Sequence, residues 1–251
     1  MSDLVGVERR GRILVVSLQR EHKRNAVDRA LADALDQALN LLEDDPDLWV
    51  GVLTGTPAVF SAGSDLASRG DYVTERGGEY GIIRRRRSKP LIAAVEGVAL
   101  GGGFEIVLAC DLVVAARDAR FGLPEVRRGL VPTCAGLFRG PRALPLNLAR
   151  EVALIGDPVG AERLHAAGFV NVLAEPGGAV DAAVALAERM CLSGPVAVRA
   201  CLQAIDDIVS TDDEAGWAAT GRASDAIRAS EDMHEGLRAF FEKRPPEWKA
   251  R

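Results

Sequence analysis

The chain has 251 residues, of which 48% are hydrophobic and 27% charged, and its formal net charge is −5 with a pI of about 5.4. This composition is typical of a folded globular protein with one large domain, and it excludes an intrinsically disordered chain. The acidic balance argues against general nucleic-acid binding, so we expect no nucleic-acid partner. The N-terminal residues carry no basic segment followed by an apolar run, so we expect no secretory signal and a cytoplasmic location.

The cysteines and histidines do not form a metal-binding pattern. No C-x-x-C motif occurs, and the three histidines do not lie near the cysteines at metal-ligand spacing. The sequence therefore predicts no metal site, and scattered thiols fit a reducing compartment. The most apolar stretch, residues 90–116, is interrupted by three acidic residues, so it predicts a buried core and no membrane partner. The cysteines are Cys110, Cys134, Cys191 and Cys201.

The first half of the chain alternates expected strands with expected helices. Asp28 is positioned to cap a helix with apolar residues on one face, and Pro46 lies beyond its end. A second helix is expected at about 74–87, before Pro90. This alternation predicts crossover connections and an α/β core. Strands are expected at 5–9, 13–18, 49–54, 91–95 and 112–116, and a third helix at about 102–109.

The second half is expected to be mainly helical. After about residue 133, only residues 170–173 have the pattern of a strand. A soft boundary near Ser193-Gly194-Pro195 divides an expected core of residues 1–194 from a helical region of residues 195–251. Helices are expected at 146–155, 160–167, 177–191, 196–209, 213–229 and 231–243.

The triplet Gly101-Gly102-Gly103 follows an apolar strand and opens a helix. A helix start presents unpaired N–H groups with partial positive charge, and glycine lets a ligand approach them closely. The triplet therefore suits the negative oxygen that develops on a reacting carbonyl. Its spacing is neither G-x-G-x-x-G nor a P-loop, which disfavours a dinucleotide site. Tight helix–strand packing is the alternative interpretation.

A second small-residue segment, Ser61-Ala62-Gly63-Ser64-Asp65, follows the strand expected at 49–54. It suits a tight turn with exposed N–H groups. One donor from this segment and one from Gly102 would form a two-pronged oxyanion hole. A plain surface loop is the alternative.

Two glutamates follow these backbone signals. Glu105 falls on the first turn of the glycine-started helix, where the dipole favours an acid and simple capping is the alternative. Glu125 follows Pro124 in an extended segment, where a surface carboxylate is the alternative. Two carboxylates that face one water can divide acid and base duties, provided that their environments separate their pKa values.

In combination, these segments resemble the crotonase (enoyl-CoA hydratase/isomerase) superfamily. The segments Phe60–Leu66, Leu100–Glu105 and Phe121–Glu125 look like its two oxyanion segments and its second-glutamate segment. The resemblance extends from Arg20–Ala26 to Glu235–Arg244 and so covers essentially the whole chain. It implies a spiral of β-β-α turns, followed by a C-terminal helical region used for trimer assembly. It also implies a homotrimer or a hexamer of paired trimers.

The resemblance implies an acyl-CoA substrate and no separate cofactor, because coenzyme A is part of the substrate. The expected activity is that of an enoyl-CoA hydratase, which adds water across the 2,3 double bond of a 2-enoyl-CoA. The alternatives are an enoyl-CoA isomerase, another acyl-CoA dehydratase, or a non-catalytic acyl-CoA-binding protein. The metabolic pathway stays open, fatty acid metabolism being one of several that use this scaffold.

By position, the N–H groups of Ser64 and Gly102 would hold the thioester oxygen, and Glu105 and Glu125 match the two acidic residues of the hydratase branch. Thr133 and Ala135 replace two glycines that the family usually has after Pro132. In the family the backbone there lies near the catalytic water, so the resemblance assigns Thr133 to positioning that water. Further positions match substrate or coenzyme A contacts, namely Lys23, Arg24, Ala26, Ala62, Asp65, Leu66, Phe240 and Lys243, the last two expected from a neighbouring subunit.

The strongest charge run is Arg84-Arg85-Arg86-Arg87-Ser88-Lys89. Its plainest interpretation is a solvated helix end, where cations favour the C-terminal dipole. Long-range attraction of the coenzyme A phosphates is a second interpretation. RNA contact is the weakest, because the chain is acidic and no aromatic residues interleave the run.

Overall fold

A computed structural model of the chain describes residues 3–68, 70 and 72–249. Its main sheet has six strands in the spatial order β1-β2-β3-β6-β8-β11, in which β1 and β2 pair antiparallel and the other pairs are parallel. A smaller sheet has the order β10-β9-β7, and β4 pairs with β5. The strands are β1 (Val5–Arg10), β2 (Ile13–Leu18), β3 (Val50–Thr54), β4 (Val73–Thr74), β5 (Gly78–Glu79), β6 (Leu91–Val95), β7 (Val98–Leu100), β8 (Leu112–Ala116), β9 (Arg120–Gly122), β10 (Val159–Gly160) and β11 (Val172–Ala174).

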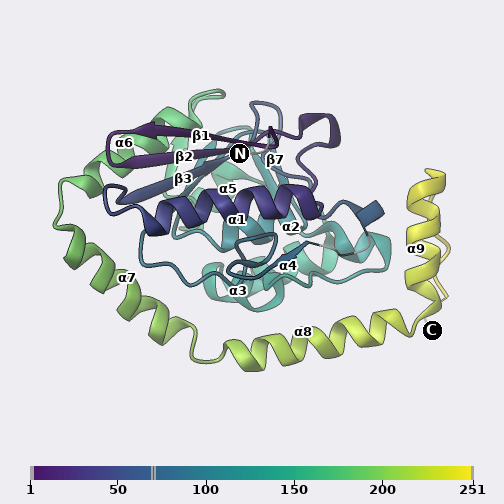
Figure 1. Cartoon of the computed structure of the whole chain (residues 1–251). Helices are drawn as coiled ribbons and strands as arrows, with labels where there is room; N and C mark the ends of the chain where they lie inside the picture. Colours follow the sequence, from purple (N-terminus) through teal and green to yellow (C-terminus); the bar gives the residue numbers. More distant parts are fainter. Residues whose placement is uncertain (1–2, 69, 71, 250–251) are drawn as a thin grey trace.

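Helices cover the sheets and dominate the C-terminal part of the chain (Figure 1). Within the described ranges, no helix has both the length and the hydropathy needed to cross a membrane. The helices are α1 (Arg29–Asp44), α2 (Gly102–Leu108), α3 (Gly136–Ala143), α4 (Leu146–Ile155), α5 (Ala161–Ala166), α6 (Ala179–Cys191), α7 (Pro195–Val209), α8 (Asp213–Arg228) and α9 (Glu231–Glu242), with 3-10 turns η1 (Glu21–Lys23), η2 (Leu66–Ser68) and η3 (Pro124–Arg128).

A repeated β-β-α turn connects the two sheets, as the resemblance implied. The chain passes from β6 in the main sheet to β7 in the smaller sheet and then enters α2. It repeats this path from β8 to β9 and then enters η3. Because β7 and β9 are parallel neighbours, Glu105 on α2 and Glu125 on η3 follow adjacent strands of one small sheet.

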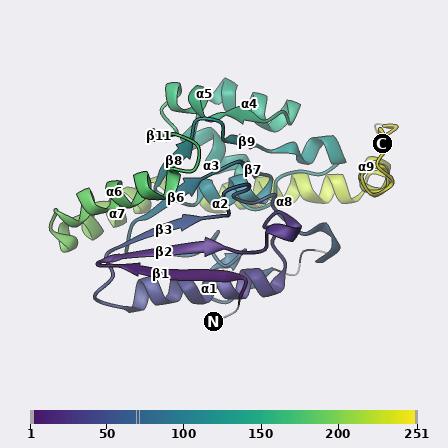
Figure 2. The same cartoon turned by 90° about the horizontal axis from the view of Figure 1, so that it is seen from above.

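The main sheet is buried on both faces because its strand residues alternate between two helical layers. On β2, Leu14 and Val16 face the core that α1 covers, whereas Ile13 and Val15 face the core that α6 covers. Figure 2 shows α1 running along β1 and β2. Asp28 caps α1 as predicted, since its Oδ1 accepts a hydrogen bond from Leu31 N–H over 2.9 Å.

The prediction of a helix at 74–87 is wrong. Residues 73–79 form the short β4–β5 hairpin instead, and turns follow it. Gly77, Gly78 and Gly81 break helical regularity here, and a Cβ on Gly77 would lie 1.9 Å from the carbonyl oxygen of Gly81. The residues between them, Glu79 and Tyr80, lie in a packed turn, which glycines at this spacing indicate and the helix prediction overlooked.

The C-terminal helices lie close to the expected ranges, and α7, α8 and α9 trace an arc around the core (Figure 1). α8 packs on α3, and α9 packs on η3, while α7 has no buried residue. The short helix α3 was missed because it contains Gly140 and Pro141, which disfavour helix in sequence reasoning. The short strands β7 and β10 were also not expected. The division between residues 1–194 and 195–251 stays a prediction.

Candidate active site

Two backbone segments meet at the N-terminal end of α2. Ser61 N–H donates to the carbonyl oxygen of Val98 over 3.1 Å, and Leu100 N–H donates to that of Ser61 over 3.0 Å. Gly63 has φ +92°, and a Cβ there would lie 2.7 Å from the nitrogen of Gly102. The first small-residue segment therefore lies directly against the glycine triplet, at a distance that only glycine permits.

The N–H groups of Ser64 and Gly102 are available to a ligand. Among the residues that the structure describes, neither N–H donates a hydrogen bond within the protein. Gly102 is the first residue of α2, where N–H groups lack an intrahelical acceptor and carry partial positive charge. Two such donors on adjoining segments can bind the oxygen of a carbonyl that gains negative charge.

Glu105 is buried on the first turn of α2, with an exposed fraction of 1%. Its Oε1 accepts hydrogen bonds from the N–H groups of Cys134 over 2.7 Å and Gly136 over 2.8 Å. Burial raises the pKa of Glu105 to about 7, because removal from water disfavours the carboxylate, and the two N–H donors oppose that rise. The group can therefore exchange a proton near neutral pH.

Glu125 lies at the start of η3 and has a different environment. Within the described part of the chain, its buried Oε2 has no hydrogen-bond partner. Its Oε1 would lie 3.1 Å from a Cβ on Gly101, so the carboxyl group reaches the glycine triplet. Burial raises the pKa of Glu125 to about 8, and repulsion by Glu105 adds to the rise. Buried carboxyl groups with such shifts in a site of this kind are candidates for proton transfer.

Thr133 directly precedes Cys134, whose N–H holds Glu105. The Thr133 Oγ1 lies 3.8 Å from Cys134 Sγ. Ala135 follows with φ +78°, in the left-handed region that favours glycine. The replacement of glycine by alanine at this position has therefore kept the backbone conformation that a glycine would adopt.

The structure joins the segment around Lys23 to the first small-residue segment. Ala62 N–H donates to the carbonyl oxygen of Arg24 over 3.0 Å. Arg20 bonds both the carbonyl oxygen of Ala26, over 2.7 Å, and the carboxylate of Asp65, over 2.9 Å. Most residues assigned to coenzyme A by resemblance therefore share one network beside Ser64, and Leu66 begins η2 next to it, although their contact with coenzyme A stays a prediction.

Phe240 and Lys243 are placed elsewhere, on α9 beside η3. The Arg128 guanidinium lies over the Phe240 ring, 4.8 Å from its centroid. Lys243 ends α9 in the left-handed conformation, with φ +56°. Within this chain Phe240 belongs to the α9–η3 contact and Lys243 is exposed. Their part in a coenzyme A site of a neighbouring subunit stays a prediction.

Sequence reasoning missed two tyrosines at the site. Tyr80 has an exposed fraction of 1%, and its hydroxyl lies 2.6 Å from Ser64 Oγ. A Cβ on Gly102 would lie 2.3 Å from that same hydroxyl. The Tyr72 ring packs against the Tyr80 ring with centroids 4.5 Å apart. The helix expected at 74–87 concealed Tyr80, although the flanking Gly77-Gly78 and Gly81 signalled a turn, and Tyr72 lies just before that range.

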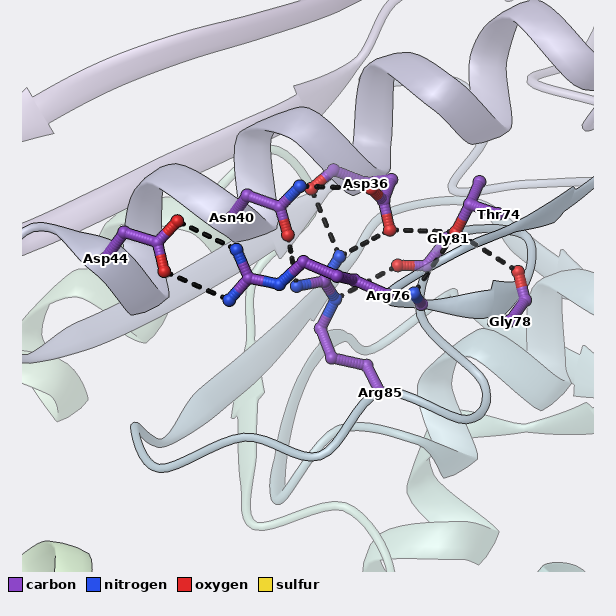
Figure 3. A network of polar contacts seen from close by, with 9 residues as sticks. Asp36, Asn40, Asp44, Thr74, Arg76, Gly78, Gly81 and Arg85 are labelled. Atoms are coloured by element: carbon purple, nitrogen blue, oxygen red, sulfur yellow. Dashed lines mark hydrogen bonds and ion pairs between the residues drawn. The ribbon is translucent and has the colours of Figure 1, made fainter.

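A polar network fastens the segment that carries these tyrosines to α1. Figure 3 shows the Arg85 guanidinium directed at α1, where it bonds Asn40 over 2.8 Å and the carboxylate of Asp36 over 2.5 Å. Thr74 Oγ1 donates to the same carboxylate over 2.8 Å, and Arg85 Nε donates to the carbonyl oxygen of Gly81 over 3.1 Å. Thr74 and Arg85, which lie on either side of Tyr80 in the sequence, therefore both bond to Asp36 on α1.

The basic run at 84–89 is not a solvated helix end. The side chains of Arg85 and Arg87 are 2% and 8% exposed, and they pair with Asp36 and Asp111. Lys89 is also buried, and its ammonium donates to two carbonyl oxygens at the end of α1. The run mostly joins elements inside the protein, which leaves few of its charges for a phosphate or for RNA.

The spiral fold, the paired backbone donors and the two buried carboxyl groups define a protein of the acyl-thioester-processing class. The enoyl-CoA hydratase/isomerase family model matches residues 8–251, so the chain belongs to that family. It is 38% identical over 248 residues to a mevalonyl-coenzyme A hydratase of Aspergillus fumigatus, covering 94% of this chain and 91% of that protein.

Further relatives agree with this membership. The chain is 35% identical over 256 residues to a 2,3-dehydroadipyl-CoA hydratase of Escherichia coli, and the match covers 100% of both proteins. Among solved structures, a carnitinyl-CoA hydratase from Mycobacterium avium superposes with a TM-score of 0.93 at 40% identity, with full coverage of both chains. These similarities confirm the crotonase fold that the sequence predicted.

Proposed function

We propose that the protein is an acyl-CoA hydratase that adds water across the 2,3 double bond of a 2-enoyl-CoA, or removes it in the reverse direction. One observation carries the proposal: two buried carboxyl groups with raised pKa values lie beside two N–H groups that no described residue uses. Relatives named as hydratases and dehydratases of coenzyme A thioesters support it. Membership in the family makes an isomerase the alternative within the same fold.

The N–H groups of Ser64 and Gly102 would donate hydrogen bonds to the thioester oxygen. An enoyl thioester takes a nucleophile at C3 only if that oxygen can accept negative charge. Oxyanion donors of this kind are each worth about 3 kcal/mol of barrier in well-studied enzymes. The Gly102 donor gains from its place at the start of α2.

The two glutamates would divide the proton transfers according to their environments. Glu105 accepts two N–H hydrogen bonds that stabilise its carboxylate, so it would act as the base that takes a proton from water. Glu125 has no described partner at Oε2, and burial and repulsion by Glu105 raise its pKa, so it would hold a proton and deliver it to C2. The oxygen of water then bonds to C3, and dehydration reverses both transfers.

The chain itself would supply all the proton donors and acceptors of this reaction, so we propose no cofactor besides the coenzyme A of the substrate. Within the described residues, no group of three or more His, Cys, Asp or Glu side chains has the arrangement of a metal site. We also propose that the enzyme works in the cytoplasm, in line with its composition and thiols.

We further propose a homotrimer or a hexamer assembled through the C-terminal region. The support is the exposure of large apolar side chains at the end of α6 and on α7, where Leu192, Val196 and Ile208 have exposed fractions of 89%, 78% and 77%. Exposed large apolar side chains of this kind are candidates for burial between subunits. Sedimentation velocity of the purified protein would show the assembly.

The test is loss of the ultraviolet absorbance of the enoyl thioester when the protein meets crotonyl-CoA. Rapid loss in the wild type, together with its absence in Glu105→Gln and Glu125→Gln, is the expected result. Binding without turnover would indicate a non-catalytic acyl-CoA-binding protein. Movement of the double bond without addition of water would indicate an isomerase.

A further inference from the structure

Four hydroxyl side chains gather beside the two segments that carry the backbone donors. We call this group the hydroxyl wall, and it consists of Ser64, Tyr72, Tyr80 and Thr133. Ser64 lies on the first small-residue segment, and the Tyr80 hydroxyl packs against Gly102 on the second. Thr133 stands beside Cys134, which holds Glu105. The hydroxyl wall therefore borders the space between the proposed thioester oxygen and the proposed base.

The hydroxyls are neutral hydrogen-bond donors. Burial raises the pKa of Tyr72 to about 12, and the neighbouring hydroxyls of Ser64, Tyr80 and Thr133 partly oppose that rise. Burial also raises the pKa of Tyr80 well above its usual value. In a chain of hydroxyls each O–H donates to the next oxygen, so the terminal O–H is left for an acceptor outside the chain.

Tyr72 is the member of the pair that a ligand can reach. Ser64 and Tyr80 hydrogen-bond each other over 2.6 Å, and Tyr80 is fully buried. Tyr72 packs on Tyr80 and stays partly exposed. An acyl chain that displaces water from the partly exposed Tyr72 hydroxyl without offering an acceptor removes a hydrogen bond from it, and that loss is unfavourable.

The backbone that presents the tyrosines is strained and firmly held. Tyr80 has φ +57°, which bulky residues rarely adopt. Its N–H donates to the carbonyl oxygen of Tyr72 over 2.9 Å, which sets the two rings side by side. Arg139 also donates to the carbonyl oxygen of Ile83 over 2.8 Å, from α3. Strain that is maintained by surrounding contacts is typical of a functional site.

We propose that the hydroxyl wall selects enoyl-CoA substrates whose acyl chain carries an oxygen substituent next to the double bond, with the Tyr72 hydroxyl donating to that oxygen. This inference rests on the proposed acyl-CoA function and specifies its substrate class. Tyr72 is a specificity-determining residue, and it takes no part in the proton transfers. The substituent oxygen accepts the hydrogen bond that a hydrocarbon chain cannot accept.

The test compares crotonyl-CoA with 4-hydroxycrotonyl-CoA, which differ by one oxygen atom. We expect kcat/KM of the wild type to favour the hydroxylated substrate at least tenfold, as a site built around donors discriminates against a substrate without the acceptor. Tyr72→Phe should reduce that preference about tenfold. Glu75→Gln, an exposed change on the same segment, should not alter it.

The outcomes separate this inference from the proposed function. Equal turnover of both substrates, or an equal loss with both in Tyr72→Phe, would overturn the inference and leave the hydratase function intact. No turnover of either substrate would overturn the hydratase function. In that case, the affinities for butyryl-CoA and 4-hydroxybutyryl-CoA measure the preference without catalysis, and equal dissociation constants would overturn the inference as well.

Discussion

The N–H of Gly136 lies 2.8 Å from Oε1 of Glu105, and a Cβ on Gly136 would come within 2.9 Å of that same oxygen. Gly136 thus donates a hydrogen bond to Oε1 of Glu105 and, because it has no Cβ, leaves room for that oxygen. The donor stabilises the carboxylate, and the missing Cβ lets it approach. The position of the proposed base therefore depends on a glycine 31 residues away in the sequence.

Gly136→Ala should lower kcat at least tenfold while the protein stays folded. The new methyl group keeps the N–H donor but pushes the Glu105 carboxyl out of place, and misplacement of a catalytic group is costly. Gly140→Ala is the matched control on the same helix, because a Cβ there meets no atom within 4 Å. It should retain full activity. Equal kcat values in the two variants would mean that the placement of Glu105 is unimportant.

Glu125→Gln should lower kcat at least a hundredfold and leave affinity for an acyl-CoA nearly unchanged. The amide keeps the shape of the side chain but cannot deliver a carboxylic proton. Steady-state rates with crotonyl-CoA and titration with a saturated acyl-CoA measure the two quantities. A variant with near-full rate would remove Glu125 from the mechanism.

A plot of kcat/KM for hydration against pH should be a narrow bell-shaped curve. The base must be ionised, so kcat/KM for hydration falls below about pH 7, where Glu105 becomes protonated. The acid must be protonated, so kcat/KM falls again above about pH 8, where Glu125 loses its proton. The two limbs belong to the pair, because the groups repel each other. A rate independent of pH from 5 to 10 would contradict these roles.

The free energy of unfolding should also depend on pH through Glu125. The pKa of Glu125 is about 8 in the folded protein against an ordinary value of 4.5, so its contribution is full below about pH 4.5 and is lost as the pH rises through 8. Glu125→Gln has no such loss. Its free energy of unfolding should therefore increase relative to the wild type between pH 5 and 9, as measured by urea titrations. A constant difference would show that Glu125 is ionised without penalty.

Ala135→Gly should stabilise the protein by about 1 kcal/mol. Ala135 has φ +78°, and this conformation costs an L-residue roughly 1–2 kcal/mol, partly offset by the greater entropy of glycine in the unfolded chain. Chemical denaturation of the two proteins measures the difference. A destabilised variant would show that the Ala135 methyl, which is buried, contributes more by packing than its backbone strain costs.

The sequence by itself determined the α/β class and the order of the site segments. Strands of continuous apolar residues and the Asp28 cap are local signals, and they placed the main strands and α1. The glycine triplet and the two glutamates were likewise visible, because each has its own backbone context. Local patterns of this kind depend only on neighbouring residues, so they need no knowledge of the fold.

Only the tertiary structure decided what these residues touch. It joined Glu105 to the N–H groups of Cys134 and Gly136, and it left Glu125 buried without a described partner at Oε2, which together set the pKa values. It also placed Tyr72 and Tyr80 at the site, Tyr80 through a glycine-rich turn in the range where a helix was expected. Burial and long-range hydrogen bonds depend on the whole packed chain, so no local pattern contains them.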